Sequence, residues 1–236
     1  MTDVHNTNHK DNGSHHLDRQ TVRVVAATQG MGPLQGRSAE DVIAYAARVS
    51  SPQNQEEFNT ASKLIRYCIK NQHWSIFEQA SVTIEITTSL AIATQILRHR
   101  SFTFQQYSGR YAQMQDKITY KARRQDNKNR QNSIDDLPAE VQTWFEDAQQ
   151  SVWDLAKSKY DEAITNGIAK EQARFLLPQN TSSTLYMTGT VRSWIHYINL
   201  RSAHGTQLEH MDVANKCKQQ FVEHFPNIAK ALEWTL

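Results

Sequence analysis

The fold is set by SVTIEITTSLAIATQILRHRSFTFQQYSGR, residues 81–110. Its first part, residues 81–87, alternates apolar with polar side chains, as a strand with one buried face does. Residues 90–99 then follow a helical spacing, and residues 101–107 alternate again. The stretch therefore predicts a strand, a helix and a second strand, with basic residues at the end of the helix.

Elsewhere, helices and strands are mixed without a regular strand–helix–strand rhythm. Two further strands are predicted, at residues 21–27 and 185–188. Five further helices are predicted, at residues 38–49, 55–69, 138–166, 169–177 and 190–202, and another follows Thr206. Ser38 with Asp41 and Thr206 with Glu209 form capping-box patterns, and Thr190 can cap its own helix. This order favours the α+β class over doubly wound α/β.

Length and composition narrow the class of protein. The chain has 236 residues, a formal net charge of +2 and two cysteines. Residues 1–20 are predicted to be a disordered, polar tail, and residues 21–236 are predicted to be a single domain. The tail lacks the apolar segment of a secretory signal, and its histidines are interpreted as solvated, so no metal site is predicted. No apolar run of about 18 residues predicts a membrane span.

The two cysteines and the mild charge also bear on function. Cys68 and Cys217 lie in apolar, helix-like contexts and are expected to be reduced core thiols, which favours a cytoplasmic protein. A net charge this small does not by itself imply nucleic-acid binding.

Arg98-His99-Arg100 is followed, after the predicted second strand, by Ser108-Gly109-Arg110. Guanidinium groups, a serine hydroxyl and a glycine that lets the backbone approach an anion suit a phosphate group. Helical spacing would place Gln95, Arg98 and His99 on one helix face, where a buried arginine needs an anionic partner. The alternative is a solvated basic patch, but such patches more often use lysine.

A second polar face is predicted near the C-terminus. Arg192, His196 and Asn199 share one side of the helix at residues 190–202. Arg201 follows at the end of that helix, where it can also complement the helix dipole.

Two further groups of residues could contribute to a site. Arg174 stands among apolar residues, which predicts a buried stem and a head that reaches an anion. His73 and Glu78 could act together in acid–base chemistry, although a capping role for His73 is the simpler interpretation.

Taken together, these clusters resemble the flavin-dependent thymidylate synthases. The family signature, Arg-His-Arg, seven residues, Ser, stands here as RHRSFTFQQYSGR, residues 98–110. Matching segments occur in the same order: AARVS (46–50), NQHWSIFEQASVTIEI (71–86), ARFLLP (173–178) and TGTVRSWIHYINLR (188–201). The resemblance, which spans about residues 21–225, implies an α+β fold with a central, mostly antiparallel sheet flanked by helices. It also implies a homotetramer whose active sites are shared between subunits.

The resemblance implies ligand contacts residue by residue. Contacts to deoxyuridylate (dUMP) are implied for Gln95, Arg98, Gln106, Tyr107, Ser108, Gly109, Arg110, Arg174 and Arg201. Contacts to FAD are implied for Ser75, Arg98, His99, Arg100, Gln106, Thr190, Val191, Arg192 and His196. His73 is implied to lie near the flavin and folate. Arg201 matches the arginine thought to ionise the pyrimidine at N3, which makes it the expected catalytic residue.

The implied reaction is reductive methylation of dUMP to dTMP. In this reaction 5,10-methylenetetrahydrofolate supplies the carbon and NADPH re-reduces the FAD. Three places depart from the family: Thr190 stands where Asn is usual, Gln106 where Glu is frequent, and His204 is shifted by one position within SAHGTQLEH, residues 202–210.

The same residues are compatible with other functions. Ser108 with His99 could form a serine acyl- or phosphoryl-transfer pair. The Arg-His-Arg patch with the basic loop at residues 117–130 could bind nucleic acid, or Arg123 and Arg124 could hold the anionic tail of folate. The main interpretation predicts small-molecule partners, with no nucleic acid and no membrane. Classical thymidylate synthases need a thiolate, which two helix-packed cysteines disfavour.

Overall fold

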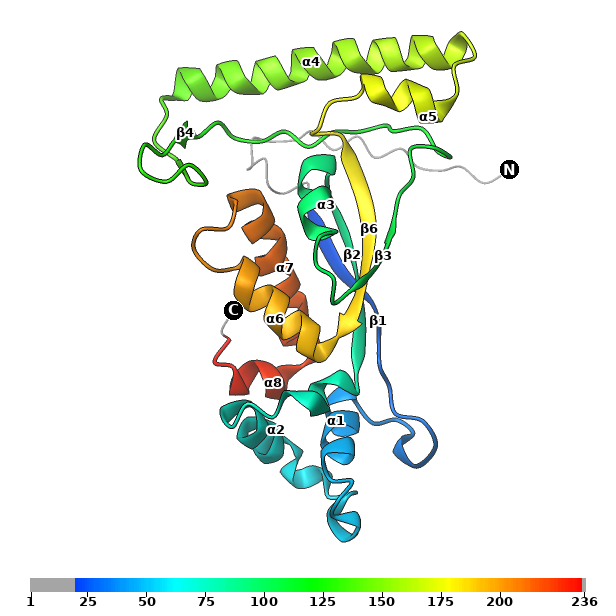
Figure 1. The fold of residues 1–236 in the computed structure, drawn as a ribbon, viewed down its shortest axis with the longest axis vertical. Helices are drawn as coiled ribbons and strands as arrows, with labels where there is room; N and C mark the ends of the chain where they lie inside the picture. The colour runs from blue at the N-terminus through cyan, green and yellow to red at the C-terminus, as the bar shows by residue number, and fades with distance from the viewer. Residues whose placement is uncertain (1–19, 235–236) are drawn as a thin grey trace, which may run out of the picture.

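The computed structural model describes residues 20–234 and has a four-stranded sheet at its centre (Figure 1). The strands are β1 (Thr21–Ala27), β2 (Ser81–Ser89), β3 (Thr103–Gln106) and β6 (Ser182–Thr190). They are ordered β1-β2-β6-β3, and every neighbouring pair is antiparallel. With helices packed around this sheet, the expected α+β fold is confirmed.

Strand β2 packs on the core through one face because its alternating sequence makes that face apolar. Val82, Ile84 and Ile86 are all buried on that face. On the other face the hydroxyl groups of Thr83 and Thr188 are 2.9 Å apart across the β2–β6 pair. One face therefore carries the core, and the other is held by polar cross-strand pairs.

The pairing of β2 with β6 runs along the whole of both strands. Ser81 lies opposite Thr190, and Ser89 lies opposite Ser182. The residues that follow β6 therefore lie beside the start of β2, and the residues that follow β2 lie beside the start of β6.

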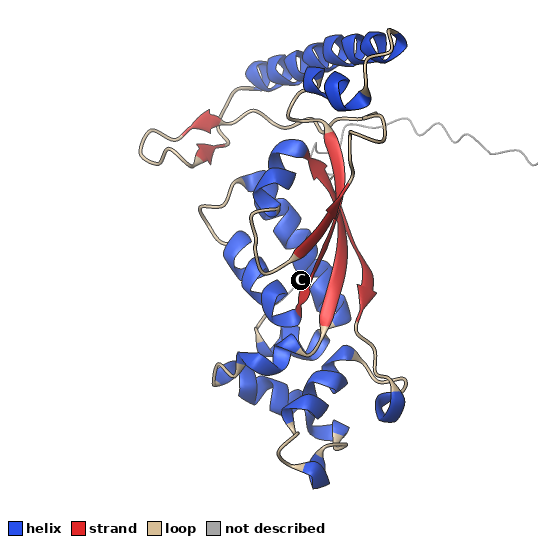
Figure 2. Cartoon of the chain, turned by 45° about the vertical axis from the view of Figure 1, so that its right-hand side comes forward, coloured by secondary structure: helices blue, strands red, loops and turns tan. Residues whose placement is uncertain are grey.

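Three helices pack on the apolar side of the sheet: α3 (Leu90–Ile96), α6 (Val191–Arg201) and α7 (Leu208–His224) (Figures 1 and 2). Trp194 of α6 is fully buried, and its Nε1 donates a hydrogen bond to the Val82 carbonyl at 3.1 Å. Cys217 of α7 is also fully buried. The buried faces of α6 and α7 thus join the sheet in one core.

A second group of helices lies at the opposite end of the sheet from α4 (Figure 1): α1 (Ala39–Ala47), α2 (Ala61–Lys70) and α8 (Pro226–Ala231). The Ser38–Asp41 capping box of α1 is present as predicted. This helix ends before Val49, which is 69% exposed. The second helix begins at Ala61 rather than Gln55, because short 3₁₀ turns take up much of the segment after Pro52.

The long helix α4 (Ala139–Thr165) lies across the other end of the sheet, with α5 (Lys170–Ala173) beside it (Figure 1). It starts after Pro138 as predicted. The preceding basic loop carries a small hairpin, β4 (Arg124–Gln125) with β5 (Ser133–Ile134). Three of its cations are paired within the chain: Lys121 with Asp135, Arg123 with Glu209, and Arg124 with Asp136.

Several predicted boundaries are wrong. The helix after β2 ends at Ile96, three residues early, and the strand predicted at residues 101–107 is limited to β3. The strand predicted at residues 185–188 extends over all of β6. Gln207, not Thr206, precedes α7, and no side-chain hydrogen bond caps this helix. Within residues 20–234 no helix is both long and apolar enough to cross a membrane.

The predicted disordered tail lies outside the described residues except for Gln20. This residue is only 1% exposed and donates to Asp212 at 2.9 Å, while Thr88 donates to its side-chain oxygen at 2.6 Å. The prediction of disorder is therefore wrong at position 20, because these polar partners hold its amide inside the fold.

Gly189 provides a test of how closely the sheet packs on the helices. A Cβ atom at this position would lie 2.4 Å from Cδ1 of the buried Phe102 ring. We expect Gly189→Ala to lower the free energy of unfolding by about 1–3 kcal/mol, because the ring must move within a packed core. Urea unfolding followed by fluorescence measures the change. Phe102→Leu should partly rescue the variant, and an unchanged stability of Gly189→Ala would contradict the packing.

Candidate functional site

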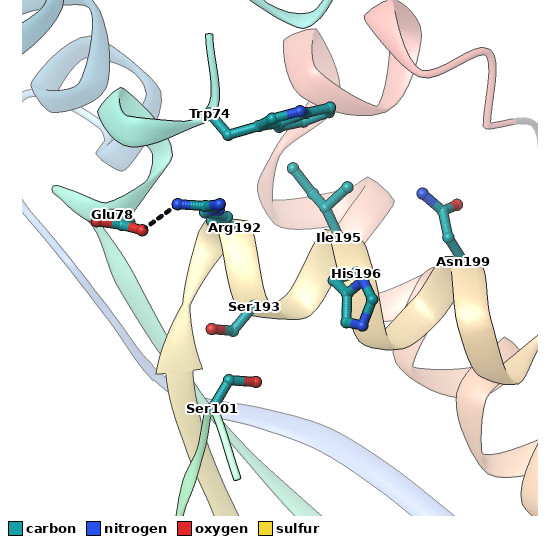
Figure 3. Close-up of a pocket in the computed structure, with 8 residues that line it drawn as sticks. All are labelled: Trp74, Glu78, Ser101, Arg192, Ser193, Ile195, His196 and Asn199. Carbon is teal, nitrogen blue, oxygen red and sulfur yellow. Dashed lines mark hydrogen bonds and ion pairs between the residues drawn. The ribbon is translucent and has the colours of Figure 1, made fainter. Parts of the chain in front are cut away.

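A cavity of about 550 Å³ opens where β6 ends and α6 begins (Figure 3). It is lined by an indole ring, basic groups and small polar groups: Trp74, Glu78, Ser101, Arg192, Ser193, Ile195, His196 and Asn199. The predicted shared face of Arg192, His196 and Asn199 is confirmed, because all three project from α6 into this cavity. We call it the indole cavity.

Glu78 balances the charge of the indole cavity. Its carboxylate lies 2.5 Å from the Arg192 guanidinium. His73 is exposed and does not line the cavity, and its ring packs edge-on against Tyr67. The structure therefore pairs Glu78 with Arg192 and does not support the acid–base pairing of Glu78 with His73.

The turn from β6 into α6 positions the α6 residues that line the indole cavity. The Thr190 hydroxyl accepts a hydrogen bond from the Ser193 backbone N–H at 3.2 Å, so the predicted cap is confirmed. Val191 is fully buried and its N–H donates to the Ala80 carbonyl at 2.9 Å. Because Asn caps helices about as well as Thr, the departure at position 190 leaves this turn intact.

A second cavity, of about 270 Å³, lies at the opposite end of the central strands. It is lined by Leu90, Gln106, Tyr107, Ser108, Gly109, Met114, Arg174 and Leu177. A Cβ atom on Gly109 would lie 3.5 Å from Cδ of Arg174 and would fill part of this space. We call it the Ser-Gly-Arg cavity, after the loop at residues 108–110.

Arg174 lines this second cavity, and Arg110 follows its lining residue Gly109 without lining the cavity itself. Arg110 is paired with Glu171 at 3.2 Å, and both side chains are about half exposed. Arg174 is exposed, and its Nε donates to the Glu171 carbonyl at 3.2 Å. The prediction of a buried Arg174 stem is wrong, because the neighbouring Phe175 is itself 75% exposed and gives no apolar cover. Both guanidinium groups are nevertheless placed where an anion could reach them.

Arg201 lines neither cavity and lies against His99. The Arg201 Nε donates to the His99 Nε2 at 2.9 Å, so the His99 hydrogen is on Nδ1. Burial, the Arg201 charge and the nearby His196 lower the pKa of His99 to about 4. At neutral pH the pair therefore carries one positive charge, and that charge is on Arg201.

The remaining basic residues of the signature, on either side of His99, are on the surface. Arg98 and Arg100 are exposed and line neither cavity. The prediction that Gln95, Arg98 and His99 share one helix face is wrong, because α3 ends at Ile96 and the last two residues lie in a turn. Ser75 is exposed in the 3₁₀ helix Trp74–Glu78. The ligand roles of these residues remain predictions.

The structure disfavours the four alternative hypotheses. The His99 Nε2 is engaged by Arg201 and the Ser108 Oγ accepts from the Arg110 N–H, so among residues 20–234 no Ser–His pair forms. The paired cations of the basic loop weaken both the nucleic-acid and the folate-tail hypotheses. Burial raises the pKa values of the Cys68 and Cys217 thiols, which disfavours a thiolate mechanism.

Some lining residues carried no signal in the sequence. Trp74 stands out only as part of a matching segment, and neither Ser101 nor Met114 has a motif of its own. Tyr197 and His210, whose side chains are 3.2 Å apart in the core beside His99, were also missed. Tyr197 lies in α6 and His210 in α7, and the sequence does not show that the fold brings these two side chains together.

The fold and these cavities together define an α+β protein with separate places for a ring system and for an anion. The family model for thymidylate synthase complementing protein matches residues 34–227. The chain therefore belongs to that family, the flavin-dependent thymidylate synthases.

Two relatives illustrate the likeness. A probable flavin-dependent thymidylate synthase of Paramecium bursaria Chlorella virus 1 is 54% identical over 198 residues, which cover 84% of this chain and 92% of the viral protein. The flavin-dependent thymidylate synthase of Synechocystis sp. is 51% identical over 215 residues, covering 90% of this chain and 99% of the cyanobacterial protein.

A solved structure has the same fold. The UMP/dUMP methylase PolB from Streptomyces cacaoi, determined with bound 5-Br dUMP, gives a TM-score of 0.76 at 23% identity. The match covers 91% of this chain and 94% of that one. At this level of identity the likeness supports the architecture alone.

The residues that line the indole cavity are of the kinds that could hold a flavin. Trp74 and Ile195 offer apolar surfaces to a ring system, while Arg192 and His196 offer donors to charged or polar groups. Its volume of about 550 Å³ is in the usual range for small-molecule sites. The residues present are therefore suited to the cofactor that the family name specifies.

The lowered pKa of His99 predicts a pH dependence of stability. Because the unfolded chain takes up this proton below about pH 6.5 and the folded chain only near pH 4, stability falls as the pH drops between these values. We expect His99→Gln to lose less unfolding free energy between pH 7 and pH 5 than the parent protein does. Urea titrations at both pH values measure the loss. His204→Gln, at an exposed loop position, serves as the control. If His99→Gln lost as much unfolding free energy as the parent protein, the result would contradict a neutral His99.

Proposed function

We propose that this chain, a flavin-dependent thymidylate synthase, binds its flavin as FAD and converts dUMP to dTMP. The carbon donor is 5,10-methylenetetrahydrofolate and the reductant is NADPH. The proposal rests on the family match and on cavities whose chemistry suits a ring system and a phosphate. A cytoplasmic location agrees with the buried, unpaired thiols of Cys68 and Cys217.

The observation that carries the proposal is the separation of the two cavities. They lie at opposite ends of β2 and β6, which span roughly 25 Å at about 3.3 Å per residue. One mononucleotide cannot reach from the phosphate loop of a chain to the indole cavity of the same chain. We infer that a second copy brings its own phosphate loop to this cavity, in a homotetramer with shared active sites.

The outer face of α4 supports such an assembly. Trp144, Val152 and Leu155 recur at helical spacing and are 66%, 57% and 64% exposed. Large apolar side chains in a row on one exposed helix face are typical of a surface that another subunit covers.

Each group of residues has a distinct task. Trp74, Arg192, His196 and the 190–193 turn would hold the flavin, which supplies the hydride when bound. Ser108, Arg110 and Arg174 would bind the nucleotide phosphate and so orient the uracil. Arg201, hydrogen-bonded to His99, would stabilise negative charge that develops on the pyrimidine. The roles of Ser75, Arg98, Arg100 and His73 follow the family resemblance.

The absorbance spectrum of the purified protein tests the cofactor. We expect the bands of an oxidised flavin, and heat-released cofactor that co-elutes with FAD. NADPH oxidation should require the protein and should change in rate when dUMP is added. A colourless protein that takes up no FAD would overturn the proposal.

Arg110→Ala tests the phosphate site. The variant should raise the KM for dUMP by about tenfold or more, because a charge-assisted hydrogen bond to the phosphate is lost. Steady-state kinetics with dUMP as the varied substrate measure this. Glu171→Gln is the matched control: it frees Arg110 from its partner and should leave the KM unchanged or lower it. If Arg110→Ala left the KM for dUMP unaltered, the result would contradict binding of the phosphate by Arg110.

Arg201→Ala tests the catalytic assignment. We expect kcat to fall about 100-fold or more, because charge on the pyrimidine loses its nearest cation, while the flavin spectrum is retained. Arg66→Ala, at an exposed position of α2 that lines neither cavity, controls for loss of surface charge. Turnover of Arg201→Ala equal to that of the control would refute the role of Arg201.

A further inference from the structure

A line of hydrogen bonds leads from the basic loop into the core beside Arg201. It starts at Glu209, near the beginning of α7, whose side chain is 3% exposed. One carboxylate oxygen accepts from the Arg123 guanidinium, and the other accepts from the Gln207 amide at 2.9 Å. Both carboxylate oxygens of Glu209 are thus acceptors in this line.

The line continues through a second amide to an imidazole. The Gln207 Oε1 accepts from the Gln95 Nε2 at 2.6 Å. The Gln95 Oε1 then lies 3.3 Å from the His210 Nδ1, and the His210 Nε2 lies 3.2 Å from the Tyr197 hydroxyl. His210 and Tyr197 are both fully buried.

The two accepting oxygens of Glu209 give this line one direction. A carboxylate can only accept, so Gln207 must turn its NH₂ group to Glu209 and its oxygen to Gln95. Gln95 must then turn its NH₂ group to Gln207 and its oxygen to His210. His210 must therefore carry its hydrogen on Nδ1, which leaves the Nε2 free to accept from the Tyr197 hydroxyl.

The inner end of the line meets the expected catalytic residue. The Tyr197 ring packs edge-on against the His99 ring at a centroid distance of 4.9 Å, and His99 accepts from Arg201. Burial, followed by the charges of Arg201 and His99, lowers the pKa of His210 to about 3, and burial keeps the Tyr197 hydroxyl protonated. His210 therefore does not compete with Arg201 as a cation, and Tyr197 does not become an anion beside it.

We propose that Arg123, Glu209 and Gln207 are positioning residues that fix the orientation of the Gln95 amide and the tautomer of His210 beside Arg201. Their kinetic consequence rests on the proposed function, in which Gln95 contacts dUMP. A fixed amide presents one N–H and one carbonyl lone pair to the pyrimidine in set directions, which favours binding of uracil. The tautomer itself does not depend on the reaction.

Gln207→Met breaks the line without removing a buried charge. Gln207 is exposed, so the variant should fold, and its side chain can neither donate to Glu209 nor accept from Gln95. Solid-state NMR of protein labelled with ¹⁵N-histidine reports which imidazole nitrogen carries the hydrogen. The signal that is missing from the spectrum of His210→Gln is assigned to His210.

At neutral pH the parent protein should show His210 with its hydrogen on Nδ1. Gln207→Met should show a second population with the hydrogen on Nε2. A parent protein with the hydrogen already on Nε2, or a variant whose His210 signal is unchanged, would overturn the proposal. These spectra need no substrate, so an inactive parent protein would count against the proposed function and not against the tautomer.

Kinetics provide a second readout that a loss of folding would not imitate. Gln207→Met should raise the KM for dUMP about fivefold, the effect of one hydrogen bond, with kcat within about twofold of the parent. Gln150→Met removes an exposed amide that likewise donates to a carboxylate, Asp154, and should leave both constants unchanged. A fall in kcat alone, or equal constants for the two variants, would contradict the positioning role.

Discussion

The antiparallel pairing of β2 with β6 is the constraint on which the rest of the structure depends. It places Thr190 and the start of α6 beside Ser81, and it places Leu90 and the start of α3 beside Ser182. The indole cavity and the Ser-Gly-Arg cavity consequently lie at opposite ends of the same two strands. Under the proposed function, such a chain carries both parts of its site, and a second copy is needed to bring them together.

The charge distribution around Arg201 follows from burial. His99 and His210 have pKa values lowered to about 4 and about 3, so each is neutral beside the guanidinium at physiological pH. Glu209 supplies the carboxylate in the line of hydrogen bonds from Arg123 to Tyr197, and it is already paired with Arg123. Arg201 is therefore left as a cation without a carboxylate partner among the contacts that the described residues show, which suits a role toward an electron-rich ring.

The sequence could predict what depends on local spacing. The alternation of residues 81–87, the capping box at Ser38 and the cap at Thr190 each act within a few residues, and the structure confirms them. The polar face of Arg192, His196 and Asn199 was likewise visible as a helical period. The family signature at residues 98–110 then indicated the chemistry, which the family match supports.

What the sequence could not predict depends on contacts between distant elements. Helix spacing continues past Ile96, but the helix stops there, so Arg98 and His99 lie in a turn. Gln20 looked like part of a polar tail until its partners Thr88 and Asp212 were brought to it by the fold. The line from Arg123 to Tyr197 joins a loop and three helices, and no motif marks it.

Complementation between two impaired variants tests the central claim that the site is built from two chains. Arg110→Ala lacks an anchor in the phosphate loop, and Arg192→Ala lacks one in the indole cavity, so each alone should have little activity at dUMP concentrations well below the KM of the parent protein. If the halves come from different copies, mixed oligomers should recover roughly a quarter of the parent activity, because random pairing leaves that share of sites intact. Mixed oligomers no more active than the separate variants would show that both halves belong to one chain, which would contradict this account.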